Sequence, residues 1–600
     1  MSHTFHIPVL GLGYTVDTPI KVAPYGISSV ASIVDDIAIE RIRAFYYEKI
    51  GKPYVEINKN EDDSRAKRIT AYLNMMQDLI DEEFKTIQNS GFGAGSKLHT
   101  YFKLLPNDSV LAQKYQQMLI EDDIQKKQEL QNLLKNAITK GEIDVNIMAK
   151  VDKMNVNAKG EIKEEIYSDA LASLRGFANS RLHSSVVLSA GMNPRLYSYL
   201  DSFPDFLPDE NQHLKKKVIL KVSDFRSAFI QAKFLAKKGI WISEFRIESG
   251  LNCGGHAFAT EGFLLGPILE EFKQKRTEMI TELFDLYQKA LAIKEITIDI
   301  APAMKICVQG GIGTAAENEF LIRYYQMDAT GWGSPFLLVP EVTAVDNQTL
   351  QDLSIATEDD FYISGSSPLG IPFNNFKKSG AEKQRLQRIA DGKPGSPCTK
   401  KFLVSNTEFT AQPICTASRK YQSLKIKELK KEELSPEVYQ QKFDAITEKI
   451  CLCEGLVNSY YVKNNMLSPK ENKAVAICPG PNIAFFKGPY SLEQMVNHIY
   501  GKINLLEGVK RPHMFINELK LYIEYLRKDI EANLQEMNAK KEKSLNNFIN
   551  QLQNGISYYK NLMSEVLSSN PNSLKEFFND LKALEVKLGT HLSRNKQYFR

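Results

Sequence analysis

The sequence lacks the features that would mark a membrane or secreted protein. No apolar run reaches the roughly 18–20 residues that a membrane-spanning helix needs. The start, MSHTFHIPVLGLGYT, has no basic segment followed by a long apolar run, and no internal repeat or low-complexity tract is visible. We therefore expect neither a membrane anchor nor a signal peptide, and we predict a cytoplasmic protein.

Net charge and cysteine are also scarce. The chain has 76 Lys and Arg against 72 Asp and Glu, a formal net charge of only +4, which speaks against a nucleic-acid partner. Seven cysteines in 600 residues do not make a disulfide framework, so we expect free thiols in a reducing compartment. The remaining composition, 43% hydrophobic and 25% charged, is that of a globular protein.

Short apolar runs alternate with helical patterns through about the first 340 residues. We predict eight strands there, at residues 20–28, 52–58, 143–151, 184–192, 216–223, 240–248, 304–314 and 328–339. Apolar strands separated by helices form a parallel sheet that is covered on both faces. Eight such units in a row predict an α/β fold, a (β/α)8 TIM barrel.

Two regions fall outside this alternation. Residues 60–140 have a polar, helical pattern and predict a helical insertion. Because it follows the second predicted strand, the insertion is a candidate lid over the active-site end. We divide the chain into a barrel (1–345), a loop-rich mixed α/β extension (346–510) and a helical region (511–600), whose helices are a candidate homodimer interface.

Two glycine-rich segments come late in the predicted barrel, where active sites follow the carboxyl ends of strands. QGGIGT follows the seventh predicted strand and GWGSPF lies in the eighth. Glycines let backbone amides approach an anion, and a helix N-terminus favours negative charge; tight turns without a ligand are the alternative. The candidate residues are Gly310, Gly311, Gly313, Gly331, Gly333 and Ser334.

LNCGGHAF follows the sixth predicted strand and places Gly254 and Gly255 directly before His256. A flat ring could pack on the glycines, and an imidazole suits proton abstraction from carbon; an ordinary histidine in a tight turn is the alternative.

Polar residues in two other predicted strands, Asn146 and Lys221, are further candidates for contact with a cofactor. Their alternatives are a backbone partner for Asn146 and a carboxylate across the barrel for Lys221. The end of the first predicted strand could also lie against a flat ring, through Ala23, Pro24, Tyr25 and Gly26.

Taken together and in order, VAPYGIS, VNIMAKV, LNCGGHAF, VQGGIGT and ATGWGSPFLL resemble the nitronate monooxygenase (2-nitropropane dioxygenase-like) family. The flavin-dependent enoyl-acyl-carrier-protein reductases belong to the same superfamily of FMN-binding barrels. The resemblance covers about residues 15–340, without the insertion. It implies that His256 is the base that deprotonates the substrate. It also implies that the FMN phosphate is held by Gly310, Gly311, Gly331 and Gly333. The chain departs from the family pattern at Tyr25, Asn252, Cys253 and Ser334.

The resemblance therefore predicts an FMN-dependent oxidoreductase of nitronate monooxygenase or enoyl reductase type. The expected substrate is a small or acyl-carrier-bound carbon compound, with NAD(P)H as a candidate reductant. Longer relatives, such as the reductase components of polyunsaturated fatty acid and polyketide synthases, also carry extensions. A flavin barrel that acts as a non-catalytic assembly subunit is the alternative from another class.

Five cysteines lie in the C-terminal half, at positions 398, 415, 451, 453 and 478. An iron–sulfur cluster needs four converging thiolates, and Cys451-x-Cys453 with distant partners does not match the ligand runs of ferredoxins. We therefore predict no bound metal and expect these thiols to be buried as small hydrophobic groups. Cys307, inside the seventh predicted strand, is expected to pack in the core.

Overall fold

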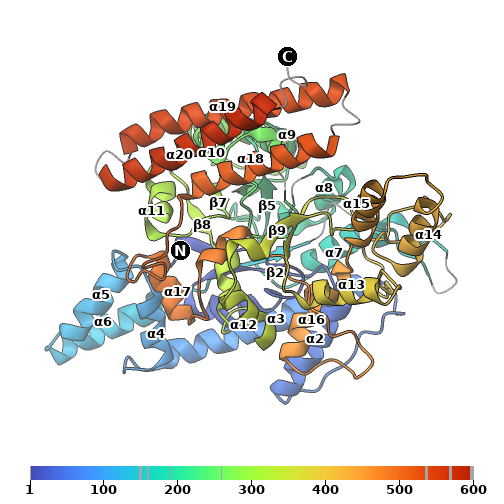
Figure 1. The fold of residues 1–600 in the computed structure, drawn as a ribbon. Coiled ribbons are helices and arrows are strands. Elements are labelled where there is room, and N and C mark those ends of the chain that lie inside the picture. The colour runs from blue at the N-terminus through green and yellow to red at the C-terminus, as the bar shows by residue number, and fades with distance from the viewer. Residues whose placement is uncertain are drawn as a thin grey trace.

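Eight parallel strands close into a barrel in the computed structural model (Figure 1). The structure describes residues 2–147, 152–157, 161–189, 191–257, 260–533, 538–566 and 571–594. Consecutive strands are neighbours, and β8 closes the barrel against β1. The strands are β1 Phe5–Ile7, β2 Ser28–Ser32, β3 Ile143–Asn146, β4 Ser184–Leu188, β5 Lys216–Val222, β6 Ile242–Glu248, β7 Lys305–Gln309 and β8 Ala329–Gly331. The predicted TIM barrel is confirmed.

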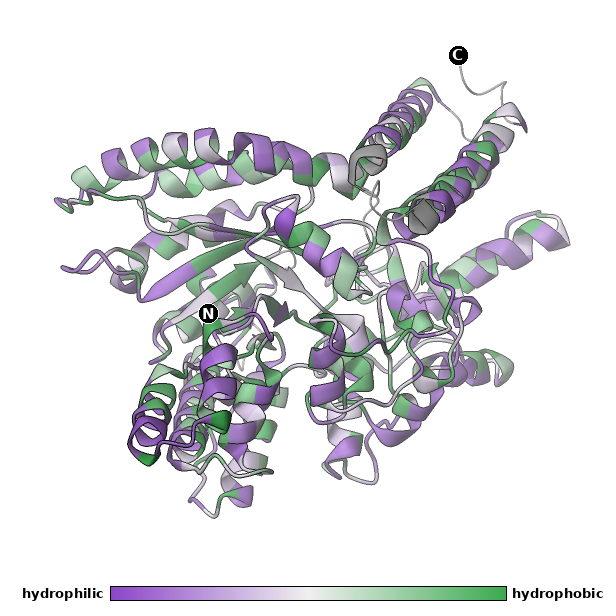
Figure 2. Cartoon of the chain, turned by 90° about the vertical axis from the view of Figure 1, so that its left-hand side faces the viewer, coloured by the Kyte–Doolittle hydropathy of each residue, from purple (hydrophilic) through white to green (hydrophobic). Residues whose placement is uncertain are grey.

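Helices that follow the strands cover the outside of the barrel. Alternate strand residues such as Phe245 and Ile247 belong to the apolar core between strands and helices, as the two-residue period of a strand requires. Hydrophilic residues line the outer helices in Figure 2. These helices are α2 Asp36–Lys49, α3 Ser64–Asn89, α7 Asp169–Ala178, α8 Pro194–Tyr199, α9 Phe225–Ala236, α10 Leu265–Ala292 and α11 Ala315–Arg323.

Six of the eight predicted strands are present with shorter bounds. Residues 148–151 of the third predicted strand and residue 190 of the fourth lie outside the described residues. The first prediction, residues 20–28, is wrong. This stretch forms α1 Thr18–Val22 and the 3-10 turn η1 Ala23–Tyr25, and β2 begins only at Ser28. Pro19 and Pro24 each stand at the start of a helical turn, where their fixed φ is favourable. The true first strand has three residues, too few to leave a periodic pattern.

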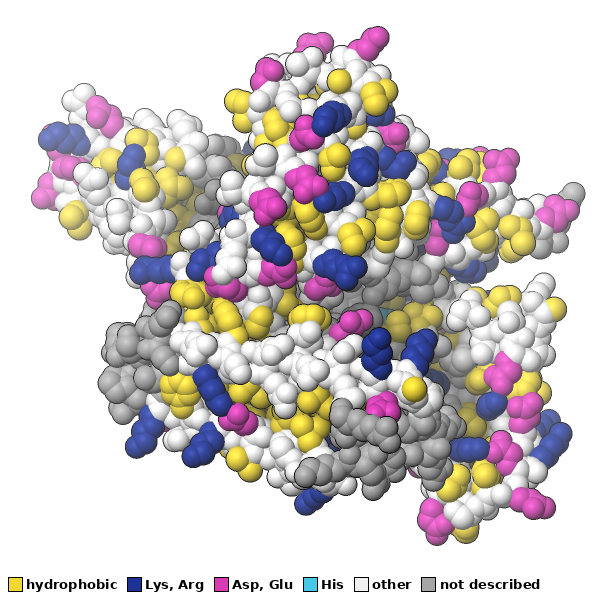
Figure 3. All heavy atoms as spheres, turned by 90° about the horizontal axis from the view of Figure 1, so that it is seen from above, with side chains coloured by type: hydrophobic (Ala, Val, Ile, Leu, Met, Phe, Trp, Pro, Cys, Tyr) yellow, Lys and Arg dark blue, Asp and Glu magenta, His cyan; other side chains and the backbone are white. Residues whose placement is uncertain are grey.

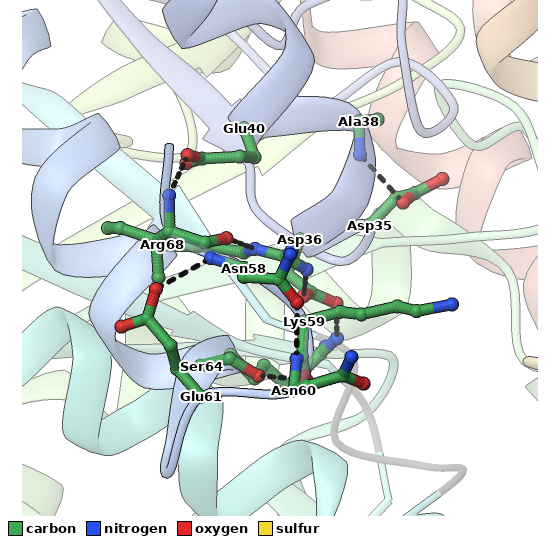
Figure 4. A network of polar contacts seen from close by, with 12 residues as sticks. Asp35, Asp36, Ala38, Glu40, Asn58, Lys59, Asn60, Glu61, Ser64 and Arg68 are labelled. Atoms are coloured by element: carbon green, nitrogen blue, oxygen red, sulfur yellow. Dashed lines mark hydrogen bonds and ion pairs between the residues drawn. The ribbon is translucent and has the colours of Figure 1, made fainter. Parts of the chain in front are cut away.

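The second predicted strand, residues 52–58, is also wrong. The segment is extended, but side chains of α2 and α3 bond to its backbone in place of a neighbouring strand (Figure 4). The Ile57 N–H donates to Glu40 at 2.8 Å, and Arg68 donates to the Ile57 carbonyl at 2.9 Å. Arg68 also pairs with Asp36 at 3.0 Å. Because these side chains satisfy the backbone, the segment needs no neighbouring strand.

The helical insertion continues from α3 into α4 Lys97–Leu104, α5 Val110–Ile120 and α6 Ile124–Ala137. Tyr101 of α4 lies 2.7 Å from the Ser2 hydroxyl and donates to the Thr139 carbonyl at 2.9 Å. Ser2 precedes β1 and Thr139 precedes β3, so both mark the amino-terminal end of the barrel. The predicted lid is therefore wrong: α4 packs at the end opposite to the candidate site.

The C-terminal extension shares one hydrophobic core with the barrel, to which Phe373, Tyr460 and Phe515 contribute beside strand residues. Its elements are α12 Asn347–Ser354, β9 Phe361–Ser364, β10 Phe373–Phe376, α13 Gly380–Ala390, α14 Arg419–Leu429, α15 Pro436–Thr447, α16 Leu452–Lys463, η8 Pro481–Phe485, α17 Leu492–Ile499, α18 Met514–Asn533, α19 Ala539–Val566 and α20 Pro571–Arg594. The last three helices lie together beside α10 (Figure 1).

Lys, Arg, Asp and Glu side chains are interspersed on the face that Figure 3 shows, without a field of one sign. This distribution agrees with the small net charge of the chain. None of the helices in the described part of the chain combines the length and apolarity that a bilayer crossing requires.

Helices α18 and α19 hold both ends of the loop that contains His256. The Glu518 carboxylate accepts the Leu265 N–H at 2.9 Å and the Tyr559 hydroxyl at 3.2 Å. The Tyr522 hydroxyl accepts the Gly250 N–H at 2.9 Å. Burial raises the pKa of Glu518 to about 7.

The raised pKa of Glu518 predicts a pH-dependent stability. A carboxyl with a raised pKa stabilises the fold while protonated, and this contribution is lost as the pH rises toward 7. We expect the free energy of unfolding of the wild type, relative to Glu518→Gln, to fall by about 2–3 kcal/mol between about pH 5 and pH 8. Urea denaturation at both pH values measures this difference, and an equal difference at the two would contradict the raised pKa.

Candidate functional site

The loops after β6, β7 and β8 meet at the carboxyl end of the barrel. The Ser334 hydroxyl donates to the Cys253 carbonyl at 2.9 Å. A Cβ atom on Gly310 would lie 2.1 Å from the Leu251 carbonyl oxygen, and one on Gly333 would lie 2.5 Å from Cys253. The three glycine-containing motifs therefore form one surface in which backbones touch.

A chain of polar side chains crosses the barrel interior next to these loops. His6 Nε2 lies 3.2 Å from Gln309 Oε1, and Gln309 donates to Glu248 at 2.9 Å. Lys221 pairs with Glu248 at 2.7 Å, a carboxylate of the neighbouring strand β6 and not one across the barrel. The two side chains are 21% and 15% exposed, whereas Arg246, one layer deeper, is 3% exposed. Lys221 and Glu248 therefore face the mouth.

His6, Glu248 and Gln309 were not predicted from the sequence, but β6 carries a signal for one of them. Its polar residues 244, 246 and 248 alternate with Phe245 and Ile247, which pack toward the helices. A period of two places the polar set on the opposite face, inside the barrel. The short β1 gives no comparable pattern around His6.

The next layer holds a buried ion-pair triad. Arg246 donates to Asp144 and to Glu244, each at 2.5 Å. Burial, only partly offset by Arg246, raises the pKa of Asp144 to about 6. In the described part of the chain, Asp144 Oδ1 and Ser32 Oγ are buried without a hydrogen-bond partner, which indicates water or ligand atoms inside the barrel.

His256 is held by the C-terminal extension. Its Nε2 atom lies 2.8 Å from Ser367 Oγ, and its ring meets Phe373 edge-on at 5.1 Å between centroids. Its carbonyl accepts the Asn252 amide at 2.6 Å, so Asn252 has a structural role in the loop. Ser367 lies between β9 and β10, and no pattern in the sequence pointed to it.

The two glycines before His256 have different surroundings. A Cβ atom on Gly254 would lie 2.2 Å from the Cys478 carbonyl oxygen, whereas one on Gly255 would meet no atom of the described residues within 4 Å. The extension therefore packs against Gly254. Gly255, whose φ is 79°, faces open space, so only Gly255 keeps the flat open surface that the sequence predicted for both.

Protein groups occupy part of the glycine loop after β7. Glu317 accepts the N–H groups of Gly313 and Thr314 at 2.8 and 3.2 Å. Arg511 pairs with Glu317 at 2.7 Å and donates to the Gly311 carbonyl at 2.6 Å. Although burial opposes it, the charge of Arg511 holds the pKa of Glu317 below its usual value. The prediction that Gly313 contacts a cofactor is wrong for this structure, because Arg511 covers it.

Three buried N–H groups in these loops remain available. Within the described residues, the N–H groups of Gly311, Ile312 and Gly333 have no acceptor in hydrogen-bonding geometry. Buried backbone N–H groups are nearly always satisfied, so a bound anion or water would complete them. These three donors can therefore bind an anion such as a phosphate. The loops do not offer such a donor at Gly310, whose N–H donates to the Gly331 carbonyl at 3.3 Å.

The residues of VAPYG are far from this surface. The Ala23 carbonyl accepts the Gly141 N–H at 2.8 Å, and His3 Nε2 lies 3.3 Å from the Tyr25 carbonyl oxygen. Gly141 precedes β3 and His3 precedes β1, so both partners stand at the amino-terminal end. The prediction that Ala23, Pro24, Tyr25 and Gly26 contact a cofactor is wrong, because this segment precedes a strand and does not end one.

Asn146 and Gly331 end β3 and β8 at the side of the mouth. Asn146 is half-buried, and its side-chain amide has no hydrogen-bond partner among the residues that the structure describes. Residues 148–151, which follow β3, lie outside that part of the chain. A Cβ atom on Gly331 would lie 2.9 Å from His6 Nε2, so this glycine makes room for the polar chain inside the barrel.

Comparisons with known proteins give no family. No family model matches the chain, and no curated protein does. Among solved structures, a point mutant of FabK from Thermotoga maritima is 12% identical, covers 67% of this chain and 84% of its own, and has a TM-score of 0.29. The enoyl reductase domain of MlnA from Bacillus amyloliquefaciens is 14% identical over 72% and 88%, with a TM-score of 0.30. Likeness at this level bears on neither activity nor cofactor.

The buried Arg511–Glu317 pair predicts a large cost for its disruption. Arg511→Met leaves Glu317 buried without its cation, which costs about 3–5 kcal/mol of unfolding free energy. Lys520→Met is the matched control, since Lys520 pairs with Glu358 at 2.7 Å where both are about half exposed; exposed pairs contribute at most about 1 kcal/mol. Urea denaturation compares the two, and similar losses would show that the buried pair has no special role.

Proposed function

We propose that the carboxyl end of the barrel is the active site of an FMN-dependent oxidoreductase. The observation that carries the proposal is the convergence of the three motif loops around unsatisfied N–H groups. The N–H groups of Gly311, Ile312 and Gly333 offer donors for a phosphate. The polar chain that ends in Lys221 and Glu248 lies beside them in the barrel. An anion site next to a polar mouth suits a phosphorylated cofactor.

Each residue at the mouth has a defined part in this proposal. The open face of Gly255 leaves room for a flat ring. The amide of Asn146, which has no hydrogen-bond partner among the described residues, can bond to the polar edge of that ring. Lys221 brings a positive charge to the same mouth, held in place by Glu248. FMN, when bound, supplies the acceptance or donation of a hydride equivalent.

His256 is the proposed acid or base. A neutral imidazole accepts a proton from a carbon acid, and an imidazolium donates one to a substrate carbon. The Ser367 hydroxyl forms a hydrogen bond with His256 Nε2, and this bond fixes the plane of the imidazole ring. The contact with Phe373 excludes water from one side of the imidazole. Ser367 is thus a positioning residue for His256.

Bound flavin is the first test of the proposal. The purified protein is expected to be yellow, with about one FMN per chain released on denaturation. Colourless protein that takes up no added FMN would overturn the enzyme proposal. Anaerobic titration then separates the reaction types: bleaching by NADPH supports the reductase, and bleaching by a nitronate supports the monooxygenase.

Substitution of His256 tests its chemical role. His256→Ala is expected to lower kcat about 100-fold or more, because the variant lacks the group that moves the proton. FMN should stay bound, because His256 is not among the residues proposed to hold the phosphate. Ser367→Ala should reduce kcat less and shift its pH profile. His213→Ala is the control, since that side chain is 80% exposed. Unchanged turnover in His256→Ala would remove His256 from the mechanism.

A further inference from the structure

A hollow lined by cations lies in the C-terminal extension, between α13 and the start of α16 (Figure 1). Its empty volume, counted with its open side, is about 390 Å³, which is the size of a small-ligand site. Arg385, Arg388 and Lys449 line the hollow, and none of the described lining residues is acidic. A concave surface that carries charge of one sign attracts ligands of the opposite sign, so the hollow is suited to an anion.

Cys451, another lining residue, is half-buried, and so is Cys398. The expectation that the thiols of the C-terminal half are buried is wrong for these two, because both lie near the open hollow and not inside the core. The other cysteines are buried as expected, namely Cys307, Cys415, Cys453 and Cys478. Among the described residues, no group of three or more His, Cys, Asp or Glu side chains is placed to hold a metal ion. The cations therefore decide which ligand the hollow can take.

Arg388 holds its charge in the hollow without an ion pair. In the part of the chain that the structure describes, its half-buried guanidinium forms neither a salt bridge nor a hydrogen bond. Burial and the like charge of Arg419 lower the pKa of Arg388. Glu454 offsets these effects in part, but its carboxylate already accepts the Thr399 hydroxyl and, at 3.5 Å, the Asn472 amide. A bound anion would stabilise a cation that burial disfavours.

Lys449 is a second cation without a carboxylate in contact. Its ammonium donates to the Gly365 carbonyl, and within the described residues it forms no salt bridge. Burial lowers the pKa of Lys449, and the charge of Glu448 offsets this effect only in part. Glu448 is occupied by the Gly365 N–H, which donates to it at 2.7 Å. Because an ammonium has three N–H donors, Lys449 can keep its bond to Gly365 and also bind a ligand.

Arg385 differs from the other two cations because its charge is already paired. It donates to Glu382 at 2.9 Å, and Glu382 also accepts the Asn375 amide at 2.9 Å. Arg388 and Lys449 are therefore the two lining cations without an ion pair among the described residues. A phosphate monoester carries a charge of about −1.5 to −2 at pH 7, which matches these two cations.

We propose that this hollow binds the phosphate group of a small phosphorylated molecule through Arg388 and Lys449. The planar guanidinium of Arg388 can donate to two phosphate oxygens at once, and the ammonium of Lys449 adds a compact positive charge. A carboxylate carries a single charge and would leave one of the two cations uncompensated. The described lining contains no residue of the glycine loops of the barrel, so the proposal is independent of flavin binding there.

Calorimetric titration of the full-length protein with inorganic phosphate tests the site. The wild type is expected to bind phosphate, and Arg388→Gln should weaken this binding about 10-fold or more, because a charge-assisted contact is lost. Lys449→Gln should act in the same direction. Phosphate bound to the N–H groups of the barrel loops would persist in both variants and is thereby distinguished. A wild type that binds no phosphate would overturn the proposal.

Arg181→Gln is the matched control for these variants. It removes the same charge as Arg388→Gln, from a side chain that is 61% exposed and precedes β4, and phosphate binding should stay unchanged. Arg388→Gln is expected to fold, because Arg388 has no bond within the described residues to lose, and circular dichroism checks this. Equal phosphate affinity in Arg388→Gln, Lys449→Gln and Arg181→Gln would place the anion elsewhere and refute the assignment.

Two phosphorylated probes identify the source of the phosphate. Tighter binding of AMP than of glycerol 3-phosphate would assign the phosphate of a nucleotide, and the reverse order would assign a small phosphorylated metabolite. Acetate is the charge control and is expected to bind more weakly than inorganic phosphate. Acetate that binds as tightly as phosphate would contradict the match between two cations and a doubly charged ligand.

Discussion

The buried ion pair between Arg511 and Glu317 is the interaction on which the site depends. A buried charge is tolerated only when an opposite charge and hydrogen bonds compensate it, so the elements that supply these groups cannot separate. Glu317 accepts the Gly313 N–H in the glycine loop after β7, and it accepts the Met514 N–H at the start of α18 at 2.7 Å. Arg511 donates to the Gly311 carbonyl at 2.6 Å and to the Asn482 side chain at 2.9 Å. One ion pair thus orders a barrel loop, a helix N-terminus and two parts of the extension.

The same coupling explains why the barrel and the extension form one structure. Three separate parts of the extension touch the loop after β6: Ser367 at His256, the Cys478 carbonyl at the Gly255 N–H and Tyr522 at Gly250. Each contact pairs a polar group that the extension itself covers in part or in full, and leaving such a group covered but unpaired costs about 1–3 kcal/mol. The extension therefore shapes the loop that a compact barrel would leave to solvent. It also decides which glycine stays open to a ligand.

The sequence predicts the barrel well where its strands are long enough to show a pattern. β3 to β8 follow apolar runs, whereas the three-residue β1 cannot be distinguished from a loop, and residues 52–58 have strand composition but use Glu40 and Arg68 as partners. In the candidate site, the glycines show where a side chain cannot fit, but not what fills the space. Gly254 and Gly313 are covered by protein, while Gly255 is open. Contacts such as His256–Ser367, between residues 111 positions apart, leave no local signal at all.

The interior of the barrel adds a constraint on the chemistry at its mouth. Most barrels of this type fill the interior with branched apolar side chains. This barrel instead contains three layers of ion pairs. From the amino-terminal end to the mouth, they are Lys305–Glu142, Arg246 with its two carboxylates, and Lys221–Glu248. The outer layers are balanced pairs, whereas the middle layer places one guanidinium between two carboxylates. Its net charge therefore depends on Asp144, whose pKa is about 6. Because a charge inside a barrel is weakly screened, the protonation of Asp144 changes the potential that Lys221 and any ligand at the mouth experience. The potential at the mouth therefore depends on a buried group that lies one layer below it.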